Sequence, residues 1–187
     1  MLVSSRPWLL LAGLAVVGAA CSGGAPVAAL GPPPRCVAAD LAAKGGWQGA
    51  TGSMLGEVAI SNVGRSACTL KGYADLQLLG GHGEPLTVVL YHASQDRSGG
   101  VSGPTVTDPH AVTIAAGALN AAVVWLQWSN WCQTTPESLS ARLLLPDGGV
   151  VAVAPGSAGL GGVPRCDSGP GSQSALNESP ITEVVPE

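Results

Sequence analysis

The residues best suited to chemistry in this chain are its five cysteines, because a thiol can be acylated, paired in a disulfide or bound to a metal. The first, Cys21, directly follows Gly18-Ala19-Ala20 at the end of an uncharged apolar run over residues 8–20. The others are spread singly along the rest of the chain, as Cys36, Cys68, Cys132 and Cys166. No Cys-x-x-Cys pair occurs, so a zinc site built from cysteines is not expected.

The N-terminus has the organisation of an export signal. Residues 1–7 carry one charge, on Arg6, and the apolar run that follows is about 13 residues long, short of the roughly 20 that a membrane-spanning helix needs. The small residues before Cys21 resemble the bacterial lipobox, in which the cysteine is lipidated, here by diacylglyceryl and palmitate chains, and becomes the mature N-terminus. We expect residues 1–20 to be a lipoprotein signal peptide; ordinary secretory cleavage is the alternative.

Residues 21–35 have the composition of a tether. They are rich in Gly, Ala and Pro, end in a run of three prolines, and carry no charge before Arg35. Such a segment cannot build a hydrophobic core and acts as a spacer. Residues 36–187 would then form one domain, anchored through Cys21 at the extracytoplasmic face of the cell membrane. Two acyl chains suffice for stable anchoring.

The four remaining cysteines are an even number in an exported chain, which predicts two disulfides. Three pairings are open to them. We favour the sequential one, Cys36 with Cys68 and Cys132 with Cys166, in which each bond closes a loop of about 30 residues and contributes about 3–4 kcal/mol by the chain-entropy model.

The elements that must position these residues are predicted to be strands. Short segments rich in Val, Leu and Ile alternate with Gly, Pro, Asn and Asp. Residues 80–83 and 146–149 are tight-turn sequences, each predicting a hairpin. The expected strands cover residues 54–63, 67–70, 74–79, 86–92, 111–115, 118–128, 139–145, 150–154 and 181–185, after a short apolar segment at 37–43.

No segment has a long apolar stripe of helical period, so the fold class is all-β. Eight or nine short strands favour an antiparallel immunoglobulin-like β-sandwich with two disulfides, and a Greek-key barrel is the alternative. Residues 167–180 are expected to wrap around the domain or fray as a flexible C-terminal tail. The inward alternation that a sandwich core needs is supplied by Val58/Ile60, Leu76/Leu78 and Leu143/Leu145.

The segment from Asn62 to Tyr73 carries a family resemblance. It reads Asn-Val-Gly-Arg-Ser-Ala-Cys-Thr-Leu-Lys-Gly-Tyr and has Cys36 some 30 residues upstream. It resembles a domain-of-unknown-function family, number 4232, found in actinobacterial lipoproteins and secreted proteins, with Ala74 where that family has Pro. The resemblance covers about residues 35–166 and implies a disulfide-bonded β-sandwich but no activity. Locally, Asn62 and Gly64 suit a turn with positive φ.

Tryptophans are the candidates for ligand contact. Trp125, Trp128 and Trp131 fall within seven residues, and an odd separation in a strand places Trp125 and Trp128 on opposite faces. Trp128 and Trp47, the latter in an expected Gly-Gly-Trp loop, are predicted to bind a sugar or a partner chain if they are exposed. Packing of the tryptophan cluster against the Cys132 disulfide is the alternative.

The three histidines offer a second kind of site. His82, His92 and His110 lack ligand spacing in the sequence, but they could converge as copper or zinc ligands, with Asp96 or Asp108. No nucleophile elbow, phosphate loop or carboxylate pair at an evident spacing is present, so neither catalysis nor a cofactor is expected. The formal net charge of −4 becomes −5 once residues 1–20, with Arg6, are removed, which disfavours nucleic acid as a partner.

The sequence thus predicts a membrane-anchored, extracytoplasmic lipoprotein with a non-catalytic binding or interaction domain. Its expected partners are the membrane, through the lipid anchor, and an envelope protein or glycan. Metal binding through the loop histidines is the alternative function.

Overall fold

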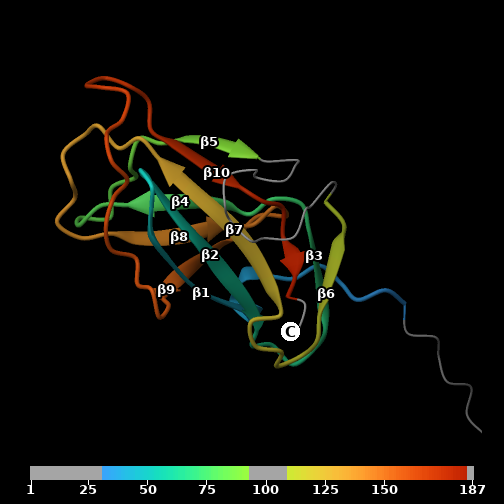
Figure 1. The fold of residues 1–187 in the computed structure, drawn as a ribbon. Coiled ribbons are helices and arrows are strands. Elements are labelled where there is room, and N and C mark those ends of the chain that lie inside the picture. The colour runs from blue at the N-terminus through green and yellow to red at the C-terminus, as the bar shows by residue number, and fades with distance from the viewer. Residues whose placement is uncertain (1–30, 93–108, 185–187) are drawn as a thin grey trace, which may run out of the picture. The chain divides into compact units, whose positions relative to one another are not determined.

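Strands make up most of the regular structure in the computed structural model, which describes residues 31–92 and 109–184 (Figure 1). The all-β class is therefore confirmed. One 3-10 turn, η1 (Ala38–Asp40), precedes the first strand, and no described helix is long and apolar enough to cross a bilayer. The strands are β1 (Leu41–Ala50), β2 (Ser53–Asn62), β3 (Cys68–Lys71), β4 (Asp75–Leu79), β5 (Val89–His92), β6 (Ala111–Ile114), β7 (Ala122–Ser129), β8 (Ser140–Leu144), β9 (Val150–Pro155), β10 (Ala175–Glu178) and β11 (Thr182–Glu183).

Nine of these strands belong to one sheet. Its order is β4-β8-β9-β1-β2-β7-β10-β5, with β11 added on β7, while β3 and β6 form a separate two-stranded sheet. Most neighbours are antiparallel, but β1 pairs parallel with β9, and β5 pairs parallel with β10. The finer assignment to an immunoglobulin-like sandwich stays a prediction.

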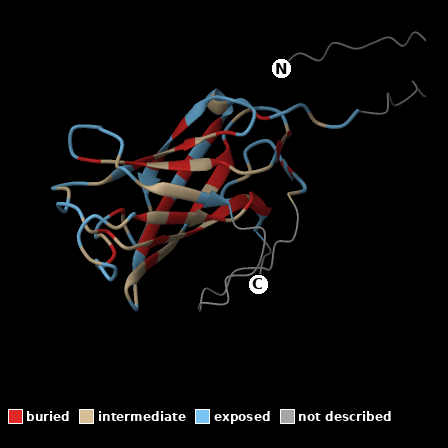
Figure 2. Cartoon of the chain, turned by 90° about the horizontal axis from the view of Figure 1, so that it is seen from above, coloured by how far each residue is buried: buried red, intermediate tan, exposed pale blue. Residues whose placement is uncertain are grey.

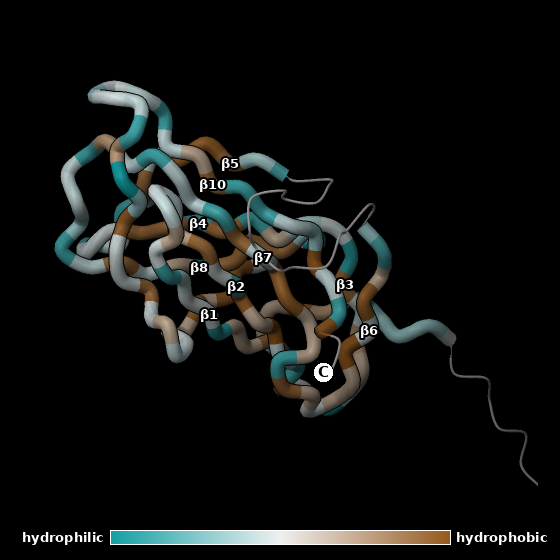
Figure 3. Tube along the Cα trace, viewed as in Figure 1, coloured by the Kyte–Doolittle hydropathy of each residue, from teal (hydrophilic) through white to brown (hydrophobic). Residues whose placement is uncertain are grey.

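The core lies where the strand alternation predicts it. Val58 and Ile60 are buried on β2, as are Leu76 and Leu78 on β4, and Leu143 and Leu145 at β8. Figure 2 shows buried residues alternating with exposed ones along the strands, and Figure 3 shows hydrophobic residues gathered on the strands. Apolar burial of this kind is the main favourable term in folding.

The segment around Gly45 and Gly46 is a correction to the sequence prediction, because it forms the middle of β1 and not a loop. Glycines there and at Gly56, which pairs with Trp47 from β2, let the backbones of the two strands lie close together. A Cβ at Gly56 would lie 2.7 Å from Trp47 Cβ, and one at Gly45 would lie 2.6 Å from the Glu57 carbonyl oxygen. The glycines are needed for close approach, which sequence patterns readily mistake for a turn.

The C-terminal segment is a second correction, because residues 167–180 include β10 and do not end in a frayed tail. This strand lies between β7 and β5, pairing with both. Leu176 and Glu178 on β10 are buried, with exposures of 2% and 0%. The segment therefore completes the sheet.

Asn62 fixes the loop that leads to Cys68 through its side chain. Its Nδ2 donates to the carbonyls of Ser66 at 2.8 Å and Ile114 at 3.2 Å, and its Oδ1 accepts from the Gly64 backbone N–H at 2.9 Å. Neither Asn62 nor Gly64 has the positive φ that the sequence suggested. Gly64 is needed because a Cβ there would lie 2.8 Å from the Asp40 side chain.

Replacement of Asn62 by alanine should lower the free energy of unfolding by at least about 2 kcal/mol, because it leaves buried backbone groups without their partner. Urea denaturation measures this loss. Ser66→Ala is the matched control, since it keeps the Ser66 carbonyl and removes an exposed hydroxyl; its effect should stay within about 0.5 kcal/mol. Equal losses in the two variants would contradict this role for Asn62.

Candidate functional site

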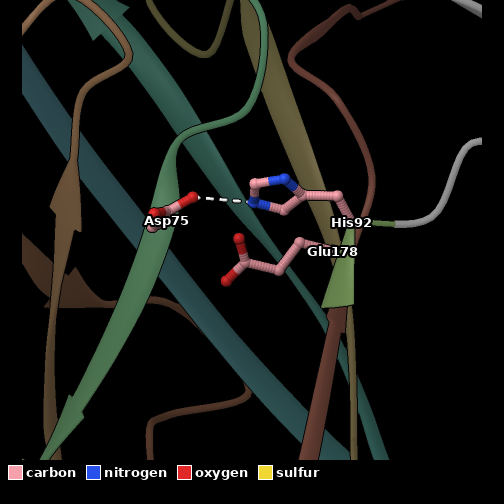
Figure 4. Close-up of side chains that lie close together, drawn as sticks. All are labelled: Asp75, His92 and Glu178. Carbon is pink, nitrogen blue, oxygen red and sulfur yellow. Dashed lines mark hydrogen bonds and ion pairs between the residues drawn. The ribbon is translucent and has the colours of Figure 1, made fainter. Parts of the chain in front are cut away.

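Three strand ends bring Asp75, His92 and Glu178 together (Figure 4). One imidazole nitrogen and one oxygen from each carboxylate all lie within 4.8 Å of one another. His92 Nε2 donates to Asp75 Oδ1 at 2.8 Å. Among the residues that the structure describes, this is the one group of three side chains of metal-binding type that converge in this way.

The topology of the sheet explains why such distant residues meet. His92 ends β5 and Glu178 ends β10, and in the parallel register of these strands the two residues are direct partners. Paired residues on neighbouring strands project their side chains to the same face. Asp75 begins β4, at the other end of the strand order, and the hydrogen bond to His92 joins the two ends of the sheet.

Tyr73 holds the imidazole of His92 in a fixed plane. The two rings are stacked, with centroids 4.1 Å apart and planes inclined by 5°. Gly72, at φ 109°, turns the chain so that Tyr73 follows β3, and its carbonyl accepts a hydrogen bond from the Ile181 backbone N–H at 2.9 Å. The C-terminal segment is thereby fixed to the turn that carries the tyrosine.

Glu178 is the buried member of the group, with an exposure of 0%. Its Oε1 accepts from the backbone N–H of Leu76 at 2.7 Å. Since Leu76 follows Asp75 directly, this bond positions the two carboxylates relative to each other. A buried carboxylate is unfavourable unless charge and hydrogen bonds compensate it.

The chemistry open to this group is binding through one nitrogen and two carboxylates. The side chains of His92 and Asp75 are 42% and 44% exposed, so a solute can reach them from water, while Glu178 forms the inner wall. Two acidic groups around one imidazole leave a negative or neutral site, which favours a cation over an anion.

Trp47 and Trp128, the sequence candidates for an exposed ligand contact, do not lie at the surface. Trp47 is 4% exposed and Trp128 is 2% exposed. The two rings pack edge to face with centroids 6.0 Å apart, and Trp128 also packs edge to face on Trp131 at 5.4 Å. The prediction that these residues meet a ligand is corrected, because both side chains fill the core.

The histidines do not converge in the described part of the chain. His82 is exposed in the turn after β4, and His110 is exposed just before β6, whereas His92 alone joins the Asp75–Glu178 group. The predicted metal partners Asp96 and Asp108 lie outside the described residues, as does Cys21.

The predicted disulfides are confirmed, with Cys36 bonded to Cys68 and Cys132 bonded to Cys166. The first bond fixes the segment around Cys36, which precedes η1, to β3. The Cys36 N–H donates to the Thr69 carbonyl at 2.9 Å, and the Thr69 N–H donates to the Pro34 carbonyl at 2.8 Å. None of the four sulfurs is a free thiol that could act as a nucleophile.

Sequence reasoning missed Asp75 and Glu178 as site residues, since it found each acidic residue isolated. The signal that could have found them is the position of each at one end of a short strand, with an aromatic residue, Tyr73, two residues before Asp75. The sequence analysis did not predict β10, so the pairing that places Glu178 beside His92 could not be inferred.

The comparisons with known proteins give one match. A family model described as a domain of unknown function (DUF4232) matches residues 36–174, which is most of the chain. No curated protein and no solved structure matches.

Proposed function

Because the chain belongs to the DUF4232 family, whose description assigns no activity, we propose a function from its own residues: a lipid-anchored binding module on the extracytoplasmic face of the cell membrane. The module is non-catalytic and meets its ligand, or an envelope protein or glycan, in solution outside the membrane. Its binding edge is the surface around Tyr73, Asp75 and His92.

The observation that carries this proposal is the use of the cysteines. Two disulfides account for four of the five, which leaves Cys21 as the odd one, directly after the apolar run. Disulfides form and persist in oxidising compartments outside the cytosol. An unpaired cysteine in an exported chain needs another chemical fate, and acylation in a lipobox-like sequence supplies one.

A further observation supports an orientation in which the end of the domain beside the tether faces the membrane. Four exposed apolar side chains, each at least 43% exposed, lie on loops and segments near the end of the tether: Val37, Val63, Leu119 and Val184. Backbone hydrogen bonds join these segments to one another, from Val63 to Asp40, from Asn62 to Ala118 and from Val184 to Ala121. An apolar end beside the tether suits contact with the interfacial region of a bilayer.

Replacement of Cys21 by alanine should abolish lipidation. In the host that exports the protein, the wild type should incorporate labelled palmitate and partition into the detergent phase on phase separation. Cys21→Ala should lose the label completely and accumulate either as uncleaved precursor or in the aqueous phase. Ser22→Ala, one residue along, is the matched control and should keep the label. Unlabelled, aqueous wild-type protein would show simple secretion instead.

Metal binding is the second candidate function, and one observation favours it. The convergence of Asp75, His92 and Glu178 supports it. This group has one histidine and two carboxylates, whereas the sequence suggested a site built from three loop histidines. The expected copper or zinc ligation by His82 and His110 gains no support from their positions.

A further inference from the structure

We propose that Asp75, His92 and Glu178 form a binding site for one Zn²⁺ ion, which names the ligand class of the binding edge and rests on the proposed binding function. The donor set is the first reason. Zinc takes imidazole nitrogen and carboxylate oxygen, and three protein ligands plus a water molecule are a common arrangement. Calcium needs six to eight oxygen ligands, and magnesium prefers carboxylates with several waters, so neither suits this group.

The spacing of the three ligand atoms is the second reason. Ligands around a tetrahedral zinc ion, at about 2.0–2.2 Å from the metal, lie about 3.3–3.6 Å apart. The atoms here span 2.8 Å, between His92 Nε2 and Asp75 Oδ1, to at most 4.8 Å. The required separation lies within this range, so small side-chain rotations complete the geometry.

The charge of the group is the third reason. Two carboxylates close to one imidazole repel each other, and Glu178 is removed from water. A divalent cation offsets both charges. Binding uses the Nε2 lone pair of a neutral imidazole, so in the bound form the single ring proton is on Nδ1 and the hydrogen bond from Nε2 to Asp75 is replaced by the bonds to the ion. A neutral ring moves its proton from Nε2 to Nδ1 by exchange with water, and an imidazolium releases its Nε2 proton to water.

The surroundings already hold the ligands in place. The Leu76 N–H bonds Glu178 Oε1 at 2.7 Å, and Tyr73 stacks on the His92 ring. Such outer contacts orient metal ligands and are worth 10- to 100-fold in affinity in known metal sites. The turn and strand ends that carry the group are fixed by sheet pairing and by the bond from Ile181 to Gly72.

The test is Zn²⁺ titration of the mature protein, exported by its own signal and purified in mild detergent, followed by calorimetry. We expect one Zn²⁺ per chain and no comparable binding of Ca²⁺ or Mg²⁺. His92→Phe keeps an aromatic ring to stack on Tyr73 and removes the ligand nitrogen. Glu178→Gln keeps an oxygen for the Leu76 N–H and removes the charge. Each should weaken Zn²⁺ binding at least about 10-fold.

His82→Ala and His110→Ala are the matched controls, because both remove an exposed imidazole outside the group. They should bind Zn²⁺ as the wild type does. Circular dichroism without metal separates loss of binding from loss of folding, and His92, at the exposed end of β5, is the variant best placed to fold normally. Absence of stoichiometric binding, or binding lost in the control variants and kept in His92→Phe, would overturn the site. Lipidation and detergent partitioning are measured separately, so the zinc site can fail while the anchored module stands.

Discussion

Trp128→Ala should lower the free energy of unfolding by about 3–5 kcal/mol, the range seen when a large buried aromatic residue is truncated. Trp128 lies on β7, between β2 and β10 in the strand order, and is 2% exposed. It contacts the rings of Trp47 and Trp131 edge to face, and its Nε1 donates to Ser174 Oγ at 2.8 Å. The variant loses apolar burial, two aromatic contacts and one buried hydrogen bond together.

Urea denaturation followed by far-UV circular dichroism measures this effect, because the fluorescence changes with the mutation itself. Trp125→Ala is the control on the same strand. Trp125 lies on the opposite face of β7 and is half-buried, so its truncation should have a clearly smaller effect. Since small domains are stable by only about 5–15 kcal/mol, the Trp128 variant should unfold at much lower urea. A loss below about 1 kcal/mol would show that the tryptophan cluster is not the centre of the core.

Removal of the Cys36–Cys68 disulfide should also destabilise the domain by about 4 kcal/mol. The bond joins residues separated by 32 positions, and the chain-entropy model gives about that value for a loop of this length. Both cysteines are buried, at 4% and 6% exposure, so the double variant Cys36→Ala/Cys68→Ala also loses packing. It also removes the covalent link between the segment that precedes η1 and β3.

The second disulfide provides the comparison for this prediction. Cys132 and Cys166 are separated by 34 positions, so loop closure predicts nearly the same entropic contribution. Cys166 is exposed and Cys132 half-buried, so their removal should leave less of a packing defect. Unfolding of both double variants in urea should therefore rank Cys36→Ala/Cys68→Ala as the less stable. Mild reductant should open the Cys132–Cys166 bond first; the opposite order would contradict the assignment of the buried bond.

Much of the fold is predictable from the sequence, because apolar residues at every second position of a strand identify the face that is buried. Val58 and Ile60 on β2, and Leu143 on β8, were assigned to the core from spacing alone. The strand β1 was missed because Gly45 and Gly46 resemble a turn. These glycines leave room for the backbones of Glu57 on β2 and of Gly159, which lie beside them only after folding.

The candidate site was less predictable than the fold. Asp75, His92 and Glu178 have no mutual spacing that a motif could capture, since they come from the ends of three different strands. Their convergence depends on the parallel register of β5 and β10 and on the meeting of the two ends of the strand order. The sequence identifies Trp47 and Trp128 as candidate contact residues. It does not show whether the face of the strand that carries each ring is buried or exposed.

The position of β10 between β7 and β5 limits the order in which the strands can pair during folding. Residues 175–178 must arrive before β5 has a partner on the sheet, and residues 153–155 must arrive before β1 pairs with β9. Pairing between segments far apart in the sequence is slow, because the chain loses loop-closure entropy before the stabilising contacts form. Folding of the complete sheet therefore waits until the C-terminal third of the chain is available to pair.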